Sequence, residues 1–217
     1  MDDINTVLTV VSALAALAYG LVMAGQAPSL QRTVVKVAAV GAIAVMAFFS
    51  DAPWLLAAGL LLCVVGDGFL AGDAQRWLPA GLFAFLIGHV LLVFLFQETR
   101  DPSLEMTSLQ IVGAVAVGVT AVATLAWLWR ALGLMRAAVT LYVIVIAVMV
   151  GSSFLLPAFY WPAMLGAGLF MTSDAILAGS VFRREALFGS DRLTRWAIWF
   201  LYYGGQALIA WAFLRMP

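Results

Sequence analysis

The sequence predicts an all-α integral membrane protein: a single membrane domain over residues 1–217 with eight transmembrane helices. Three observations lead to this prediction. Hydrophobic residues make up 65% of the chain and charged residues only 10%, whereas soluble domains have about 45–50% and about 25%. The apolar residues form eight continuous runs, most of them near the ~20 residues that cross a bilayer. The connections between the runs are short, so no soluble domain is expected between them.

The first half of the chain supplies four predicted helices, at residues 4–24, 34–49, 54–72 and 78–96. Residues 1–23 lack a basic start and a small-residue cleavage site, so we interpret them as a retained helix and not a signal peptide. Pro28 and Pro53 lie in the connections on either side of the second helix, where proline marks turns. That second run is short for a bilayer, so its helix should tilt little or extend into its flanks.

The second half supplies four more predicted helices, at residues 109–129, 137–155, 160–182 and 195–214. Asp101-Pro102 and Leu156-Pro157 break the chain between apolar runs. The runs are continuous and do not alternate apolar with polar residues, so a transmembrane β-barrel is excluded. The composition also excludes an ordinary cytosolic enzyme, a disordered protein and a nucleic-acid-binding domain.

The basic residues predict an orientation in a cell membrane. The connections after the second, fourth and sixth helices define one side of the membrane. Of the eleven Lys and Arg residues, only Arg100 and Arg215 lie on that side. The others lie in or beside the connections after the first, third, fifth and seventh helices. Because basic connections stay in the cytoplasm, both termini are predicted on the non-cytoplasmic side.

Two acidic residues, Asp67 and Asp174, fall inside predicted helices. A charged group in lipid is costly and usually functional; the alternative is a buried aspartate that hydrogen-bonds a neighbouring helix. Both follow one pattern, in which a small residue, the aspartate and two further residues precede Leu-Ala-Gly. The third and seventh helices run in the same direction, so the repeat suggests two parallel four-helix halves.

Other polar residues are predicted in the same half of the membrane. With a rise of ~1.5 Å per residue, Asp67, Asp174 and Tyr142 lie about 9–12 Å from the inner ends of their helices. The outer halves are nearly all apolar, so we expect one polar cavity open toward the cytoplasmic leaflet. The residues expected to contact a bound molecule are Lys36, His89, Tyr142, Ser173, Tyr203 and Gln206. As alternatives, Lys36 can snorkel, the tyrosines can be interfacial, and His89 can be a hydrogen-bonded packing residue.

Several other chemistries are excluded by what the sequence lacks. One histidine and one cysteine cannot build a three-His zinc site. This does not exclude a cation that binds between the two carboxylates. The sequence has no phosphate-binding P-loop and no Gly-x-Ser-x-Gly element. The single cysteine, Cys63, cannot form an internal disulfide. We therefore predict no metal centre, and the net charge of zero points to no nucleic-acid partner.

Two neighbouring carboxyl groups can divide the work of an acid and a base. A low dielectric favours the neutral form of a carboxyl group, so one can hold a proton while the other is ionised. Glycosidases use such a pair on acetals through an oxocarbenium-like transition state. A site that opens into lipid should take an amphiphilic substrate, with Lys36 or Arg32 near a phosphate headgroup.

Five ordered motifs resemble the YhhN family of membrane lysoplasmalogenases over most of the chain. They are Gly66-Asp67-x-x-Leu70, Phe83-x-Phe85 with His89, Tyr142 with Met149, Gly166-Ala167-x-x-Phe170-x-x-Ser173-Asp174, and Tyr203-x-x-Gln206-x-x-Ile209. The resemblance implies hydrolysis of the vinyl ether bond of lysoplasmalogens, without a cofactor. The products would be a fatty aldehyde and glycerophosphocholine or glycerophosphoethanolamine. The family's catalytic aspartates fall on Asp67 and Asp174. Two departures concern other positions: Val37 replaces a proline and Leu92 a common tyrosine.

The resemblance and the chemistry together suggest a mechanism. One aspartate would protonate the vinyl ether and the other would stabilise the cation, with Asp67 the more essential. The expected partners are a lysophospholipid substrate and membrane lipid. The main alternative is a proton-coupled transporter of small molecules or lipids, which paired acids and parallel repeats also fit. An intramembrane aspartyl protease and a purely structural membrane protein are the remaining alternatives.

Overall fold

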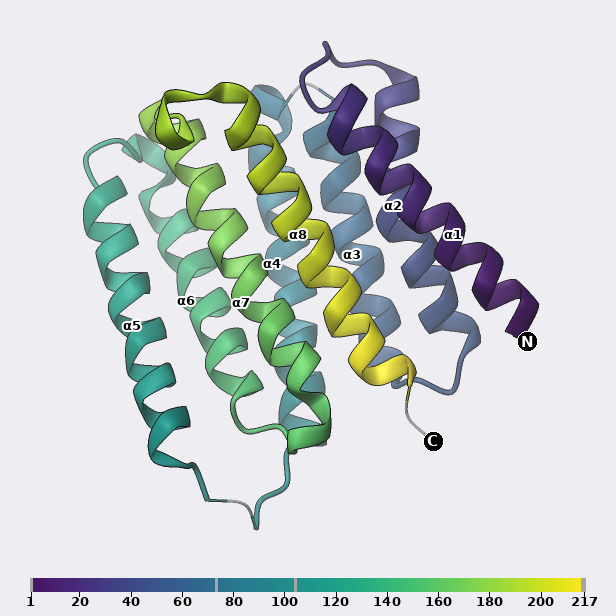
Figure 1. The fold of residues 1–217 in the computed structure, drawn as a ribbon. Coiled ribbons are helices and arrows are strands. Elements are labelled where there is room, and N and C mark those ends of the chain that lie inside the picture. Colours follow the sequence, from purple (N-terminus) through teal and green to yellow (C-terminus); the bar gives the residue numbers. More distant parts are fainter. Residues whose placement is uncertain (1, 73, 104, 216–217) are drawn as a thin grey trace.

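The computed structural model describes residues 2–72, 74–103 and 105–215, which form one bundle of α-helices that run up and down (Figure 1). The eight long helices are α1 (Asp2–Ala18), α2 (Leu30–Phe49), α3 (Trp54–Ala71), α4 (Ala74–Thr99), α5 (Ser108–Leu128), α6 (Arg136–Ser153), α7 (Trp161–Ala178) and α8 (Asp191–Leu214). Short helical turns join them: η1 (Tyr19–Met23), η2 (Gly133–Met135), η3 (Ala158–Tyr160), η4 (Gly179–Arg183) and η5 (Leu187–Gly189).

Eight helical segments of the described chain are long and apolar enough to cross a membrane. The predicted all-α, eight-helix membrane fold is therefore confirmed. The second helix extends into its flank, from Leu30 rather than residue 34, because the Ser29 hydroxyl accepts a hydrogen bond from the Arg32 amide and caps the helix there. With this extension α2 has 20 residues, which is the length that a bilayer requires.

The two halves of the chain repeat one packing feature. α3 lies along α4, and α7 lies along α8. In each pair two glycines face each other: a Cβ at Gly59 would lie 3.3 Å from the Gly88 carbonyl oxygen, and a Cβ at Gly166 would lie 2.6 Å from that of Gly205. Small residues of this kind let membrane helices approach closely. Gly59 and Gly166 each precede an intramembrane aspartate by two helical turns, which agrees with two parallel halves.

Gly166→Ala should destabilise the protein by about 1–3 kcal/mol, as overpacking of a tight contact does. The obstacle is the backbone of α8, which cannot move aside as a flexible side chain can. The measurement is the thermal unfolding midpoint of the purified protein in detergent. Gly168→Ala is the matched control, since its Cβ would meet nothing within 4 Å and alanine favours a helix over glycine. Equal midpoints for the two variants would contradict the close approach of α7 and α8.

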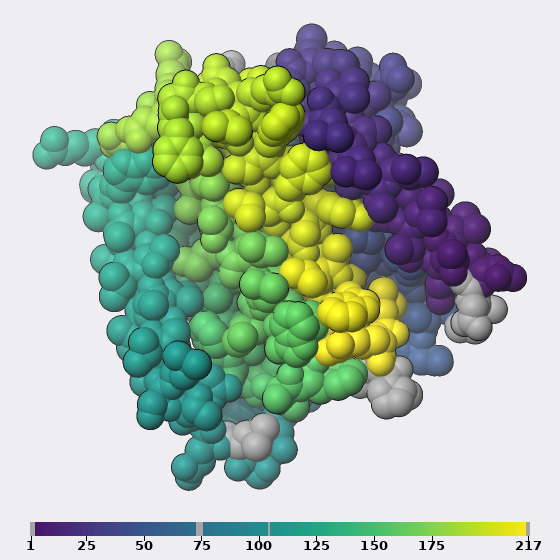
Figure 2. Space-filling model, viewed as in Figure 1, coloured from purple at the N-terminus to yellow at the C-terminus, as the bar shows by residue number. Residues whose placement is uncertain are grey.

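The helices differ in how much of their surface faces other helices. α1 and α5 lie at opposite edges of the face that Figure 2 shows, with α7 and α8 between them. Most side chains of these two edge helices are exposed, as lipid-facing residues should be.

At the end of the bundle that holds the terminus of α8, Phe96 and Phe213 stack with ring centroids 6.0 Å apart, and Tyr160 packs on Phe213 with centroids 4.9 Å apart. Aromatic side chains therefore pack α4, α8 and η3 together at that end.

The two ends of the bundle differ in how many basic residues their connections carry. The connections from α1 to α2, from α5 to α6 and from α7 to α8 lie together at the top of Figure 1. These connections and the helix ends beside them carry most of the basic residues. The start of α1 and the end of α8 lie toward the other end. We call the first the basic end; its location in the cytoplasm remains a prediction.

Candidate functional site

A cavity of about 690 Å³ extends from the basic end into the bundle. This volume lies in the range of pockets that hold small-molecule ligands. Its walls include residues of seven long helices, α2 to α8, and of both π-helical turns, η1 and η4. Turns of this type often occur at functional sites. Most of the lining is apolar, and the charged side chains that line it are Arg32, Lys36, Asp67, Asp174, Arg184 and Arg195.

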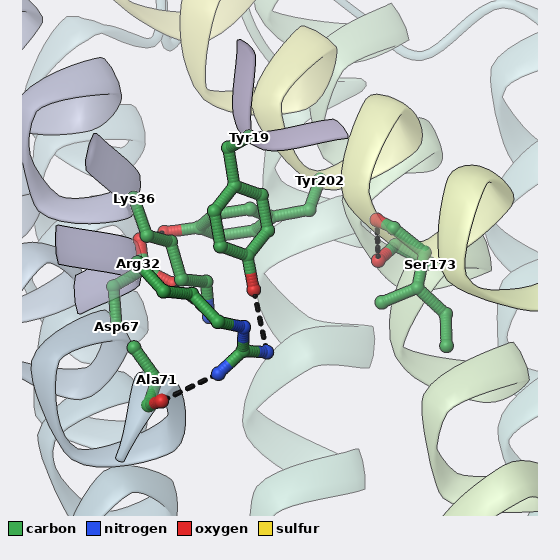
Figure 3. A network of polar contacts seen from close by, with 8 residues as sticks. Tyr19, Arg32, Lys36, Asp67, Ala71, Ser173 and Tyr202 are labelled. Carbon is green, nitrogen blue, oxygen red and sulfur yellow. Dashed lines mark hydrogen bonds and ion pairs between the residues drawn. The ribbon is translucent and has the colours of Figure 1, made fainter. Parts of the chain in front are cut away.

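Asp67 lies on α3 at the cavity wall and is only 1% exposed. Lys36 of α2 approaches its Oδ1 atom at 2.9 Å, and the Tyr202 hydroxyl of α8 donates to its Oδ2 atom at 2.6 Å. Figure 3 shows Lys36 and Tyr202 around this carboxylate. The Lys36 ammonium also lies near the rings of Tyr19 and Trp199. Because both oxygens accept hydrogen bonds, one from a cation, the surroundings suit an ionised carboxylate.

Asp174 lies on α7, also at the cavity wall, and has different surroundings. The Tyr142 hydroxyl of α6 donates to its Oδ2 atom at 2.6 Å. Within the described part of the chain no donor bonds its Oδ1 atom and no cation pairs with it. Asp174 is half-buried, and it lines the same cavity as Asp67. The cavity therefore holds two inequivalent carboxyl groups. Both oxygens of Asp67 have a hydrogen-bond donor, whereas only one oxygen of Asp174 has one in the described chain.

Ser173 also lines the cavity, beside Asp174 in sequence. Its hydroxyl donates to the Ile198 carbonyl oxygen at 2.8 Å (Figure 3). This bond joins α7 to α8 next to the two carboxyl groups. Of the eight residues predicted for the site, five thus line one cavity: Lys36, Asp67, Tyr142, Ser173 and Asp174.

Tyr203 faces away from the cavity. Its hydroxyl lies 2.8 Å from Ser12 Oγ, and Ser12 in turn donates to the Ala39 carbonyl oxygen at 2.6 Å. The phenol therefore ties α8 to α1 and α2. Adjacent residues on a helix point about 100° apart, so Tyr202 and Tyr203 cannot both face Asp67. The expected contact between Tyr203 and a bound molecule does not fit this geometry.

His89 and Gln206 are fully buried and lie outside the cavity lining. The Nδ1 atom of His89 lies 2.5 Å from the Phe85 carbonyl oxygen. Its ring packs edge-on against Phe170 and Tyr142, with centroids 4.3 Å and 5.7 Å away. His89 thus supports the tyrosine that holds Asp174. Both residues belong to the packing around the site and do not reach the cavity itself.

Sequence reasoning missed Tyr202, Arg184 and Arg195 at the cavity. One signal for Tyr202 was available, since it lies three residues after Trp199 and four before Gln206, on one helix face. The two arginines were interpreted as charges that orient the chain. None of the described residues form a group of three metal-ligating side chains. A cation between the carboxylates would have to displace the Lys36 ammonium from Asp67.

The family model described as the YhhN family matches residues 31–213. This range contains every cavity-lining residue except Tyr19 and Ala24. The chain matches no curated protein and no solved structure.

Proposed function

Because this chain belongs to the YhhN family, we propose that it is a lysoplasmalogenase-like hydrolase that cleaves the vinyl ether bond of lysoplasmalogens. The products are a fatty aldehyde and glycerophosphocholine or glycerophosphoethanolamine. One observation carries the proposal: two inequivalent carboxyl groups, Asp67 and Asp174, line a single amphipathic cavity. The cavity offers basic residues at its mouth and apolar side chains farther in, as a single-chain phospholipid requires.

The first chemical step is proton transfer to carbon. Asp174, with its free Oδ1, acts as the general acid and protonates the β-carbon of the vinyl ether. The electron pair of the double bond forms the new C–H bond, which leaves an oxocarbenium ion across the α-carbon and the ether oxygen. Asp67, as the carboxylate paired with Lys36, stabilises that positive charge in a site of low dielectric.

The second step adds water. A water molecule attacks the α-carbon, and the Asp174 carboxylate takes up its proton, so a hemiacetal forms. The hemiacetal then loses the proton of its hydroxyl group, and the bond between the α-carbon and the ether oxygen breaks. The ether oxygen leaves with a proton as the glycerol hydroxyl, and the remaining carbon becomes the aldehyde. One water molecule is consumed, and no electrons are gained or lost overall.

A tyrosine orients each acid, and the Lys36 ammonium, which pairs with Asp67 alone, makes their surroundings different. Tyr142 fixes the Oδ2 atom of Asp174, so the free oxygen has a defined direction. Tyr202 and Lys36 occupy both oxygens of Asp67, which leaves that carboxylate to act through its charge. Such a separation of acid and base by local surroundings is how paired carboxyl groups take different roles.

A proton-coupled transporter is the second candidate, because the buried acids and the parallel halves also fit one. A transporter needs a route to both membrane faces. The cavity reaches the basic end of the bundle, and at the opposite end the buried rings of Phe96, Phe213 and Tyr160 pack together. Alternating access exposes a transporter's site to one face at a time, so proton-coupled flux in liposomes is the measurement that distinguishes the two functions.

The test is incubation of the purified protein in detergent with 1-alkenyl-lysophosphatidylcholine in D₂O. We expect fatty aldehyde with one deuterium on the carbon next to the carbonyl, together with glycerophosphocholine. The saturated 1-alkyl analogue, which cannot form the oxocarbenium ion by protonation, should release nothing. The absence of aldehyde from folded protein would contradict the proposal, and proton-coupled flux in liposomes would then favour the transporter.

A further inference from the structure

Three arginines from distant parts of the chain line the cavity toward the basic end, which is its mouth. Arg32 lies in the first turn of α2, Arg184 follows η4, and Arg195 lies in the first turns of α8; all three line the cavity. The only acidic residues in the lining are Asp67 and Asp174, and Asp67 is already paired with Lys36. The mouth is therefore basic, with no carboxylate in its lining to neutralise the guanidinium groups.

Arg32 is held in a fixed position. Its guanidinium donates to the Tyr19 hydroxyl at 2.9 Å, to the Met23 carbonyl oxygen at 3.2 Å and to the Ala71 carbonyl oxygen. Figure 3 shows the bonds to Tyr19 and Ala71. The side chain thus joins η1, α2 and the end of α3 at the edge of the cavity. A fixed cation at this place attracts an anion without having to be ordered first.

Arg184 and Arg195 are not held in this way. No hydrogen bond or ion pair engages either side chain within the part of the chain that the structure describes. Their sequence neighbours are engaged: Arg183 bonds Glu185 and the Trp127 carbonyl oxygen, and Arg192 lies over the Trp196 ring. Among these four arginines, Arg184 and Arg195 are thus the two without a hydrogen bond, an ion pair or an aromatic partner among the described residues.

Arg184 has an unusual backbone conformation, and the Arg195 side chain lies against a glycine. Arg184 has a φ of 57°, in the left-handed region where a helix normally ends in glycine. A residue with a side chain is strained there, and such strain is concentrated at functional sites. A Cβ at Gly25 would lie 3.2 Å from both Nε and Nη2 of Arg195. The absence of a side chain at Gly25 leaves room for this guanidinium beside the connection between α1 and α2.

We propose that Arg184 and Arg195, with Arg32 behind them, form a binding site for a phosphate group at the mouth of the cavity. Guanidinium groups match phosphate in shape and charge, and they bind it through paired hydrogen bonds. The inference rests on the proposed function and deepens it, since the phosphate would be the phosphodiester of a lysophospholipid headgroup. Lys36, which the sequence suggested for this contact, is committed to Asp67.

This site would fix the direction in which a lysophospholipid enters. The phosphate and the ether-linked chain lie at opposite ends of one glycerol. With the phosphate at the basic mouth, the ether bond lies deeper, toward the two aspartates. The chain then lies among apolar lining residues of α5 and α6, such as Ala121, Val143 and Ile146.

The test measures the binding of a non-cleavable ligand, so it does not depend on turnover. The full-length protein in lipid nanodiscs is titrated with saturated 1-alkyl-lysophosphatidylcholine and, separately, with the phosphate-free 1-alkylglycerol. We expect Arg184→Gln and Arg195→Gln each to weaken binding of the phospholipid about tenfold or more. Binding of the alkylglycerol should be unchanged. Equal weakening for both ligands would overturn the proposal, because it would reflect damage to the cavity.

Two further variants separate binding from folding. Arg184→Gly removes the guanidinium but suits the left-handed backbone, so it should lose phospholipid affinity while its unfolding midpoint stays at or above that of the wild type. Arg192→Gln is the control. Arg192 lies in the first turn of the same helix as Arg195 but outside the cavity lining, so this variant should bind both ligands as the wild type does. If Arg184→Gly keeps full phospholipid affinity, the assigned site is wrong.

Inorganic phosphate distinguishes the two sources of a phosphate group. Weak competition by inorganic phosphate and strong competition by the lysophospholipid support a headgroup site. Equally strong competition by inorganic phosphate would overturn the headgroup assignment. Arginine-dependent binding of the lysophospholipid by protein that releases no aldehyde would support the phosphate site and contradict only the proposed function.

Discussion

Asp67→Asn should slow aldehyde release from a lysoplasmalogen by about 10²–10⁴-fold, the range expected when one acid–base or electrostatic group is lost. Asparagine keeps the size of the side chain and can still accept the hydrogen bond from Tyr202. It cannot carry the negative charge that stabilises the oxocarbenium ion. The measurement is the initial rate of aldehyde release at saturating substrate, with the folded state of the variant checked by its unfolding midpoint.

Asp174→Asn should be impaired to a similar degree for a different reason, since an amide cannot donate the proton to carbon. Asp101→Asn is the matched control. Asp101 is exposed in the connection before α5, where hydrogen bonds from the Ser103 hydroxyl and backbone amide hold its pKa below the ordinary value. Loss of a charge there should leave the rate unchanged. Full turnover by both intramembrane variants would contradict the two-carboxylate mechanism.

The fold was predictable because the bilayer restricts what a spanning segment can be. About 20 apolar residues must occur without a break, and this requirement alone located eight helices. The start of α2 was less predictable, since its first turns contain polar residues that the Ser29 cap brings into the helix. The two aspartates were found as candidates for the same reason as the helices: charged residues are rare in apolar runs.

What the sequence could not provide was rotation about each helix axis and the conformation of the connections. Tyr202 and Tyr203 are equally polar, and only the packing of α8 against α1 and α3 decides which of them bonds Asp67. The left-handed backbone at Arg184 has no signal in the residue type itself. A basic residue near a helix end is already explained as a charge that orients the chain in the membrane. For this reason nothing in the sequence separately indicated that Arg184 lines a cavity.

Lys36→Met should produce the largest loss of stability, about 3–5 kcal/mol of unfolding free energy, as the removal of one partner of a buried ion pair does. The Asp67 carboxylate is 1% exposed and the Lys36 side chain 11%, so loss of the ammonium leaves a buried charge without its cationic partner. The Tyr202 hydroxyl remains as a donor but brings no positive charge. The measurement is the free energy of unfolding in detergent at neutral pH.

The double variant Lys36→Met with Asp67→Asn separates stability from catalysis. Because both charges are gone, it should recover much of the stability lost in the single variant, while aldehyde release stays as low as in Asp67→Asn. Arg183→Gln breaks an ion pair with Glu185 whose side chains are 34% and 48% exposed, and such exposed pairs contribute about 0–1 kcal/mol. If the losses in the double variant simply add, Lys36 and Asp67 do not act as a pair. Recovered stability without activity would mean that the charge of Asp67, although destabilising when unpaired, is retained for the reaction.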